Sequence, residues 1–318
     1  MKAKKWLGLI AAMAVAVMGF AGAASAKTFV SIATGGTSGT YYPIGGAIAQ
    51  AVSKGSDIQA TAETGNASVA NANLVAKGEI EIAMVQNDIA FWAYNGKLMF
   101  KAPMKNLRAI AALYPEHVQL ITTKASGIKS ITDLKGKRVG VGAPGSGVEG
   151  DVRAIFQVAG LRYQDMKVDF LDFGATTSRF KDNQIDAGFV VAGFPTASIM
   201  DLATTKDITL VSFDSAFMKK LQKEHPFFVP SKIPAGTHRG IDHDVTTPAV
   251  MAILITHDKV SEEVVYKFTK AMFDNIKDIQ GAHAKAKEIT LKTALDGLTL
   301  PLHPGAAKFF KEKGMKVK

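Results

Sequence analysis

The sequence predicts an α/β protein of two lobes with a ligand cleft between them. Short β-branched and apolar runs alternate with helical patterns along the chain, as in sheets built from βα units. Five strand-to-helix junctions also carry small polar residues. Because open parallel sheets bind ligands beyond the carboxyl ends of their strands, these junctions predict one shared crevice.

The N-terminal segment predicts export. Three lysines in the first five residues precede an apolar run over residues 6–23, and Ala24-Ser25-Ala26 follows as a cleavage signal. This is the pattern of a secretory signal peptide, here residues 1–26 with cleavage after Ala26. We therefore expect an exported protein. The alternative is an uncleaved membrane anchor, because the run is nearly long enough to span a bilayer.

The composition excludes several classes of function. The chain has no cysteine, which rules out disulfides, thiolate catalysis and cysteine-ligated metals. A mature chain of 318 − 26 = 292 residues can bury a sufficient core without disulfides. The net charge of +10 falls to +7 when the three signal-peptide lysines leave, and the remaining basic residues form no stripe. We expect no nucleic-acid partner.

The alternation predicts ten strands and at least six helices after the signal peptide. The predicted strands are Phe29–Ala33, Ile58–Glu63, Ile80–Gln86, Leu107–Leu113, Val118–Thr123, Arg138–Gly142, Lys167–Leu171, Asp186–Val191, Thr209–Ser212 and Ala249–Thr256. The predicted helices are Ser68–Lys77, Val148–Val158, Thr176–Asp182, Phe194–Ala203, Asp214–Glu224 and Glu262–Ile279, besides one opened by Pro43.

No Pro/Ser-rich linker separates the lobes, so extended crossovers must join them. Val118–Thr123 is a candidate outward crossing, and the Pro/Gly-rich stretch 229–248 is a candidate return. This division makes residues 27–117 and 249–318 a discontinuous lobe 1, and residues 118–248 lobe 2. It fits a hinged binding protein.

The glycine-rich stretch from Ser31 to Gly46 predicts an anion site. It contains a strand, a loop with Gly35, Gly36 and Gly39, and a helix start at Pro43. Backbone N–H groups of such a loop and helix N-terminus can converge on an anion. The loop lacks the Lys-Ser/Thr ending of a nucleotide P-loop, which favours a carboxylate over a triphosphate. The alternative is a tight βα turn.

A second glycine cluster, from Gly140 to Gly147, also lies between a strand and a helix. Residues 140–145 formally match G-x-G-x-x-G, but Gly140 lies within the strand rather than after it. A dinucleotide site is therefore disfavoured. We expect a second anion site at a helix N-terminus, formed by Ser146 and Gly147, with a plain turn as the alternative.

Three further junctions carry polar groups. Gln86 and Asp88 follow an apolar strand, and Asp88 is either a helix cap or a partner for a ligand ammonium. The segments 64–68 and 193–196 occupy similar positions. No G-x-S-x-G or H-E-x-x-H motif is present, and the seven histidines lack ligand spacing, so we expect no enzyme, no metal and no cofactor.

Five blocks in order resemble the TAXI family, the periplasmic solute receptors of tripartite ATP-independent (TRAP) transporters. They are TGGTSGTYYPIGGAIA, GEIEIAMVQND, DLKGKRVGVGAPGSG, QIDAGFVVAGFP and PLHPGA. The resemblance implies a type II periplasmic binding protein fold, with two α/β lobes, two hinge crossings and a ligand in the cleft. It also implies a carboxylate ligand such as glutamate, glutamine or 2-oxoglutarate, and a TRAP permease as partner. Apart from the resemblance we expect a monomer, although the sequence leaves the oligomeric state open.

The resemblance assigns ligand contacts to the polar junctions. The sequence leaves open which of Tyr41 and Tyr42 faces the ligand, which carboxylate binds, and whether an arginine clamps it. An exported enzyme using the same cleft and an extracytoplasmic sensor are the alternatives to a transport receptor. The expected ligand contacts are Thr37, Ser38, Gly39, Tyr41, Asn66, Gln86, Asp88, Ser146, Gly147, Val148 and Pro195.

Overall fold

The computed structural model describes residues 27–317, so the predicted signal peptide lies outside the described residues. The strands form one mixed sheet in the order β2-β1-β3-β10-β4-β7-β5-β6, with β8 on β4 and β9 on β10. The strands are β1 (Thr28–Ala33), β2 (Ile58–Glu63), β3 (Ile82–Gln86), β4 (Leu107–Thr123), β5 (Arg138–Gly140), β6 (Lys167–Asp169), β7 (Ala187–Ala192), β8 (Ile208–Leu210), β9 (Val229–Ile233) and β10 (Val245–His257).

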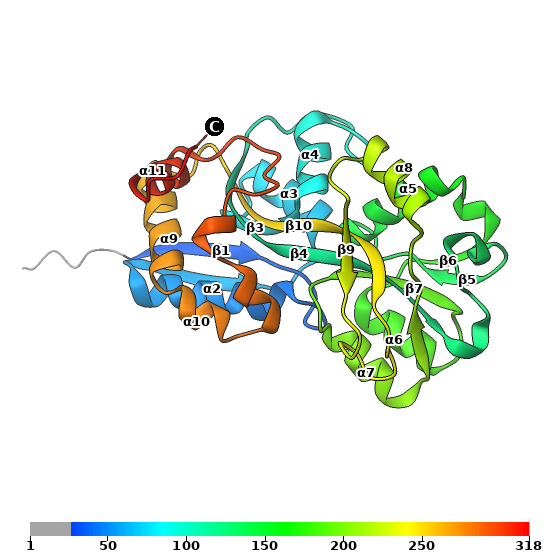
Figure 1. The fold of residues 1–318 in the computed structure, drawn as a ribbon. Helices are drawn as coiled ribbons and strands as arrows, with labels where there is room; N and C mark the ends of the chain where they lie inside the picture. The colour runs from blue at the N-terminus through cyan, green and yellow to red at the C-terminus, as the bar shows by residue number, and fades with distance from the viewer. Residues whose placement is uncertain (1–26, 318) are drawn as a thin grey trace, which may run out of the picture.

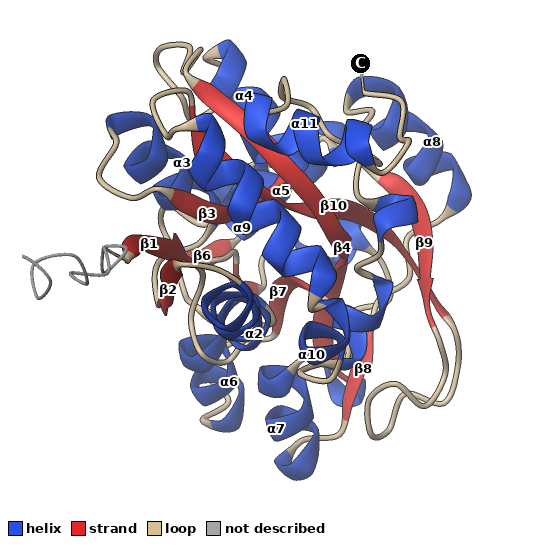
Figure 2. Cartoon of the chain, turned by 90° about the vertical axis from the view of Figure 1, so that its left-hand side faces the viewer, coloured by secondary structure: helices blue, strands red, loops and turns tan. Residues whose placement is uncertain are grey.

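Helices cover both faces of this sheet (Figure 2). Within residues 27–317, no helix combines the length and apolar character needed to cross a membrane. The α-helices are α2 (Tyr41–Gly55), α3 (Ser68–Lys77), α4 (Asn87–Asn95), α5 (Gly147–Ala159), α6 (Phe173–Lys181), α7 (Ala197–Thr205), α8 (Ser215–Glu224), α9 (Glu262–Asp274), α10 (Ile276–Gln280) and α11 (Pro304–Glu312). The short 3₁₀ helices are η2 (Lys124–Ser126), η3 (Ile131–Leu134), η4 (Tyr163–Asp165), η5 (Ala284–Glu288) and η6 (Leu291–Thr293).

Two lobes share this sheet (Figure 1). Lobe 1 is built on the parallel strands β1, β2 and β3, and lobe 2 on the parallel strands β5, β6 and β7. Strands β3 and β7 are buried along their whole length, because parallel strands are covered on both faces. This is why both read as continuous apolar runs in the sequence.

The long strands β4 and β10 join the lobes. Strand β10 pairs with β3 through residues 252–256, whereas β4 pairs with β7 through residues 117–122. Strands β10 and β4 are neighbours in the sheet, between β3 and β7, and they pair with each other in antiparallel fashion. The predicted lobe boundaries, 117/118 and 248/249, fall within these two strands.

The prediction of two strands separated near Pro115 was wrong. Strand β4 runs through Pro115, which lies opposite Met251 of β10, and the pairing of β4 with β10 has register shifts nearby. The irregular pairing accommodates a proline that lacks an N–H donor. The edge strand β9, which contains Pro230, was not predicted.

The predicted helix Glu262–Ile279 is also interrupted. Helix α9 ends at Asp274, where the Asn275 side chain donates a hydrogen bond to the Ala271 carbonyl at 2.9 Å, and α10 begins at Ile276. The periodic apolar residues Val265, Phe268 and Met272 are all fully buried, as the pattern predicted.

Candidate functional site

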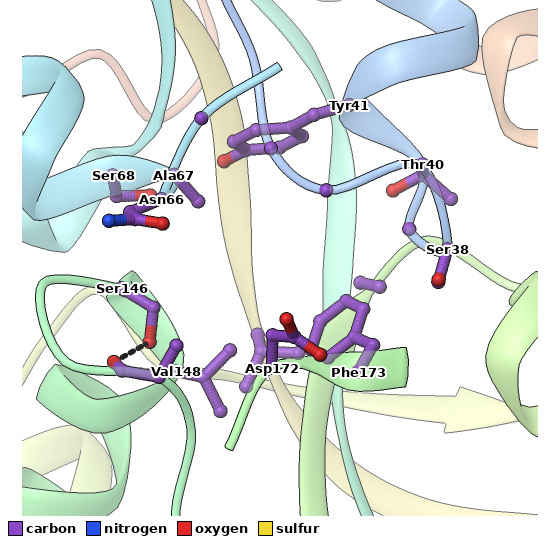
Figure 3. A pocket seen from close by; sticks show the side chains of 18 of the residues that line it. Ser38, Thr40, Tyr41, Asn66, Ala67, Ser68, Ser146, Val148, Asp172 and Phe173 are labelled. Atoms are coloured by element: carbon purple, nitrogen blue, oxygen red, sulfur yellow. Dashed lines mark hydrogen bonds between the residues drawn. The ribbon is translucent and has the colours of Figure 1, made fainter. Parts of the chain in front are cut away.

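A cavity of about 250 Å³ lies between the lobes, where the carboxyl ends of their parallel strands meet. Figure 3 shows Tyr41, Asn66 and Ser68 of lobe 1 across the cavity from Ser146, Val148 and Asp172 of lobe 2. The lining residues are Gly35–Tyr41, Gly65–Ser68, Gln86, Glu116, Ala143, Ser146–Val148, Leu171–Gly174, Val191 and Ala192.

The first glycine loop reaches the cavity and ends at the N-terminus of α2. This helix begins at Tyr41 rather than at Pro43, which is its third residue. Tyr41 is 6% exposed and lines the cavity, whereas Tyr42 is 37% exposed and does not. Of the two tyrosines, Tyr41 is therefore the one on the cavity wall.

The second glycine cluster forms the N-terminus of α5. Gly142 and Gly145 have φ values of 92° and 80°, which favour glycine. The hydroxyl of Ser146 caps the helix by accepting from the Glu149 N–H at 3.2 Å, and it donates to the Ala143 carbonyl at 2.7 Å. Gly147 and Val148, the first two residues of α5, line the cavity, so the N-terminus of this helix lies at the cavity wall.

Two more helices begin at the cavity wall. Helix α3 begins at Ser68, whose hydroxyl accepts from the Gln86 N–H at 3.0 Å, so it does not cap its own helix. Helix α6 begins at Phe173, and its N-cap Asp172 accepts from the Ala175 N–H at 2.7 Å. Four helix N-termini, two from each lobe, thus surround the cavity.

The lobes touch on both sides of this cavity. On one side the Ala70 N–H of α3 donates to the Gly145 carbonyl at 3.0 Å. On the other side the Ser198 N–H donates to the Ser38 carbonyl at 3.2 Å, and the Gly193 N–H to the Thr40 hydroxyl at 3.3 Å. These contacts between chain segments far apart in sequence define a closed arrangement of the two lobes.

Two expected contacts do not line the cavity. Asp88 is fully buried in the first turn of α4, facing Asp151 of α5 rather than the cavity. Pro195 lies behind the cavity wall, where its carbonyl accepts from His283 at 3.1 Å. At each of these two junctions a residue nearer the end of the strand lines the cavity instead, namely Gln86 before Asp88 and Ala192 before Pro195. The other nine expected contacts all line the cavity.

Sequence reasoning missed Glu116, Asp172 and Phe173 as lining residues. Glu116 is 2% exposed, but in the sequence it lies in the short segment 114–117 between two predicted strands, so nothing there marked it as buried. Asp172 is an acidic residue directly before a helix, which is a cap signal. Nothing in the sequence marked Phe173 as a lining residue.

The electrostatics of the cavity depend on backbone dipoles. Among residues 27–317, no lysine, arginine or histidine lines it. Burial raises the pKa of Glu116 to about 8, against the hydrogen bond that its carboxyl group accepts from the Tyr41 hydroxyl at 2.7 Å. Within residues 27–317, no group of three or more His, Asp or Glu side chains is placed to hold a metal ion.

The two lobes, the hinge strands and the cavity between the lobes define a periplasmic binding protein fold, which confirms the predicted fold class. The sequence pattern of the NMT1-like family matches residues 32–314. The chain therefore belongs to the NMT1-like family.

Solved structures share the fold. A protein of Bordetella bronchiseptica RB50 matches with a TM-score of 0.54 and 21% identity, over 91% of this chain and 81% of that chain. A Listeria monocytogenes protein provisionally assigned as an L-cystine ABC transporter matches with a TM-score of 0.52 and 13% identity, over 83% of this chain and 98% of that chain. The binding protein component of an ABC phosphonate transporter from Pseudomonas aeruginosa matches with a TM-score of 0.50 and 14% identity, over 82% of this chain and 78% of that chain.

Proposed function

We propose that this chain is an extracytoplasmic receptor for a small carboxylate, such as glutamate, glutamine or 2-oxoglutarate. The supporting observation is the cavity between the lobes, which in the described part of the chain is lined by four helix N-termini and by no cationic side chain. Helix N-termini bind anions through free N–H groups and the helix dipole. A cavity of about 250 Å³ suits a ligand of this size.

The proposed contacts come from both lobes. Ser38, Gly39, Tyr41 and Gln86 of lobe 1 face Ser146 and Gly147 of lobe 2, so a ligand between them would favour the closed arrangement. Thr37, Asn66 and Val148 complete the proposed set.

The proposed partner is a TRAP-type permease that recognises the closed receptor, as the resemblance to the TAXI family implies. The proposed location is the periplasm after signal-peptide cleavage. An exported enzyme is the weaker alternative, since no histidine lines the cavity and the chain has no cysteine.

The direct test is to identify what binds. Native mass spectrometry of protein purified without refolding should show a co-purifying mass that matches a small carboxylate. Calorimetry of the refolded mature protein with glutamate, glutamine and 2-oxoglutarate should then show binding, with methylphosphonate as a non-carboxylate anion for comparison. If none of the carboxylates binds, the proposal is wrong.

A capping variant tests the role of the α5 N-terminus. Ser146→Ala removes the cap of α5, which should cost about 1 kcal/mol of stability and weaken binding about tenfold through the loosened loop. Ser261 caps α9 in the same way, by accepting from the Val264 N–H at 3.2 Å, and it lies outside the cavity.

The matched control is therefore Ser261→Ala, which should lose similar stability with unchanged affinity. Calorimetry and chemical denaturation of both variants check the prediction. Equal affinities in the two variants would contradict a ligand role for the α5 N-terminus.

A further inference from the structure

Glu116 contributes a buried carboxyl group to the cavity wall. It lies in strand β4, between the lobes, and is 2% exposed. Its Oε2 accepts from the Tyr41 hydroxyl at 2.7 Å. Among residues 27–317, no side chain or backbone group donates a hydrogen bond to its other oxygen, Oε1. One carboxyl oxygen on the cavity wall thus has no partner in the protein.

Two more carboxyl groups lie beneath the cavity wall. Asp88 of α4 and Asp151 of α5 are fully buried, and they face each other across the lobe interface. If both were ionised, neither oxygen of Asp88 would have a donor. With one proton between them they form a hydrogen bond, while Gln86 Nε2 donates to Asp151 Oδ2 at 2.7 Å.

Neither of the side chains whose charge or hydrogen bond acts on Glu116, Tyr41 and Asp88, is cationic. Tyr41 of α2 and Tyr114 of β4 are buried, and burial holds the pKa of both hydroxyls well above the ordinary value. Val250 of β10 lies opposite Glu116. The neighbouring His117 hydrogen-bonds to Ser231, and burial beside Lys285 lowers its pKa to about 3.

This arrangement favours an uncharged Glu116. Burial removes hydration from its carboxylate, and the nearby Asp88 carboxyl adds repulsion, so its pKa rises to about 8. At neutral pH the carboxyl group is therefore protonated and can act as a donor. Since Oε2 accepts from Tyr41, the proton belongs on Oε1.

This inference rests on the proposed function and names a specificity-determining residue for it. We propose that Glu116 binds the ligand in its protonated form, donating a hydrogen bond from Oε1 to an oxygen of the ligand carboxylate. The receptor then holds an anion together with a proton. Ionisation of Glu116 would place a negative charge against the ligand in a cavity with no cationic side chain, so binding would weaken.

The pH dependence of affinity tests this role. Calorimetry with 2-oxoglutarate and with glutamate from pH 6 to pH 9.5 should give constant affinity below about pH 7 and a loss approaching tenfold per pH unit above the Glu116 pKa of about 8. Titrations at pH 8.5 in buffers of different ionisation enthalpy should show proton uptake on binding. Both measurements use the unmodified protein.

The variant Glu116→Gln keeps a donor that does not titrate. It should bind more weakly than wild type at pH 7, but with an affinity independent of pH up to 9. The control is Glu81→Gln, because Glu81 accepts from the Ser31 N–H at 2.9 Å and lies outside the cavity. This control should keep the wild-type pH profile. In the ligand-free protein, carbon-13 NMR should show one glutamate carboxyl that titrates near pH 8.

Three results would overturn the inference while leaving the receptor function in place. They are wild-type affinity that does not change from pH 6 to 9, a Glu116 carboxyl that titrates in its ordinary range, and glutamate affinity that rises with pH. The last would mean that ionised Glu116 pairs with the ligand ammonium. By contrast, if no carboxylate binds at any pH, the proposed function itself is wrong.

Discussion

Replacing Gly147 with alanine is expected to prevent lobe closure and weaken ligand binding about 10- to 100-fold. A Cβ at this position would lie 1.4 Å from Gln86 Oε1 and 2.9 Å from Ser68 Oγ, both in the opposite lobe. Gln86 is 2% exposed, and its Nε2 donates to Asp151 of the other lobe. The added methyl group must push the Gln86 side chain aside or hold the lobes apart, and this hydrogen bond between the lobes is lost in either case.

The control for this variant is another helical glycine with free space around it. A Cβ at Gly46 of α2 meets nothing within 4 Å, and its φ is ordinary. Gly46→Ala should keep wild-type affinity and gain up to about 1 kcal/mol of stability. Small-angle X-ray scattering should show a larger radius of gyration for Gly147→Ala in the presence of ligand. Wild-type affinity in Gly147→Ala would show that closure does not need this contact.

Replacing Phe309 with alanine is expected to cause the largest loss of stability, about 3–5 kcal/mol. Phe309 of α11 is 1% exposed and stacks on Phe273 of α9, with ring centroids 5.6 Å apart. It also packs against the edge of Phe310 at 5.3 Å. Removing the ring leaves a cavity in lobe 1, far along the chain from the ligand loops. Denaturant titration should therefore show unfolding at a lower denaturant concentration than in the wild type. The variant should keep its ligand affinity under conditions in which it is folded.

The matched control is Phe29→Ala in β1. Phe29 is 75% exposed, so its loss should change stability by no more than about 0.5 kcal/mol. If Phe309→Ala and Phe29→Ala unfolded at the same denaturant concentration, the contact between α9 and α11 would not stabilise the protein as we expect.

The predicted bounds of a helix or strand were accurate where the local sequence alone sets its two ends. The helix Ser68–Lys77 and the strand Ile58–Glu63 have the predicted bounds. Predicted bounds were less accurate where a contact elsewhere sets the end of an element. Helix α6 begins three residues before the predicted Thr176, because Asp172 caps it. The predicted helix Phe194–Ala203 begins only at Ala197.

The sequence pointed to the loops that line the cavity but not to the buried groups of its wall. The glycine loops were recognised because their backbone conformations and helix starts leave a local signature in residue types. Asp88 carried the same signature of a polar residue after a strand, but it is directed at Asp151, 63 positions further along the chain. Only the packing of α4 against α5 decides that direction.

The sequence by itself determined the α/β class and the polar loops at the strand ends, because hydrophobic periodicity and glycine and proline conformations are local properties of the chain. It also marked a segment with the pattern of an export signal. The tertiary structure decided which polar groups face the cavity, that β4 and β10 are continuous across both lobes, and that Glu116 lies among carboxyl groups without a cation. These features arise from contacts between residues far apart in sequence. Such contacts set which way a side chain points, and the burial that they cause sets whether a carboxyl group is charged.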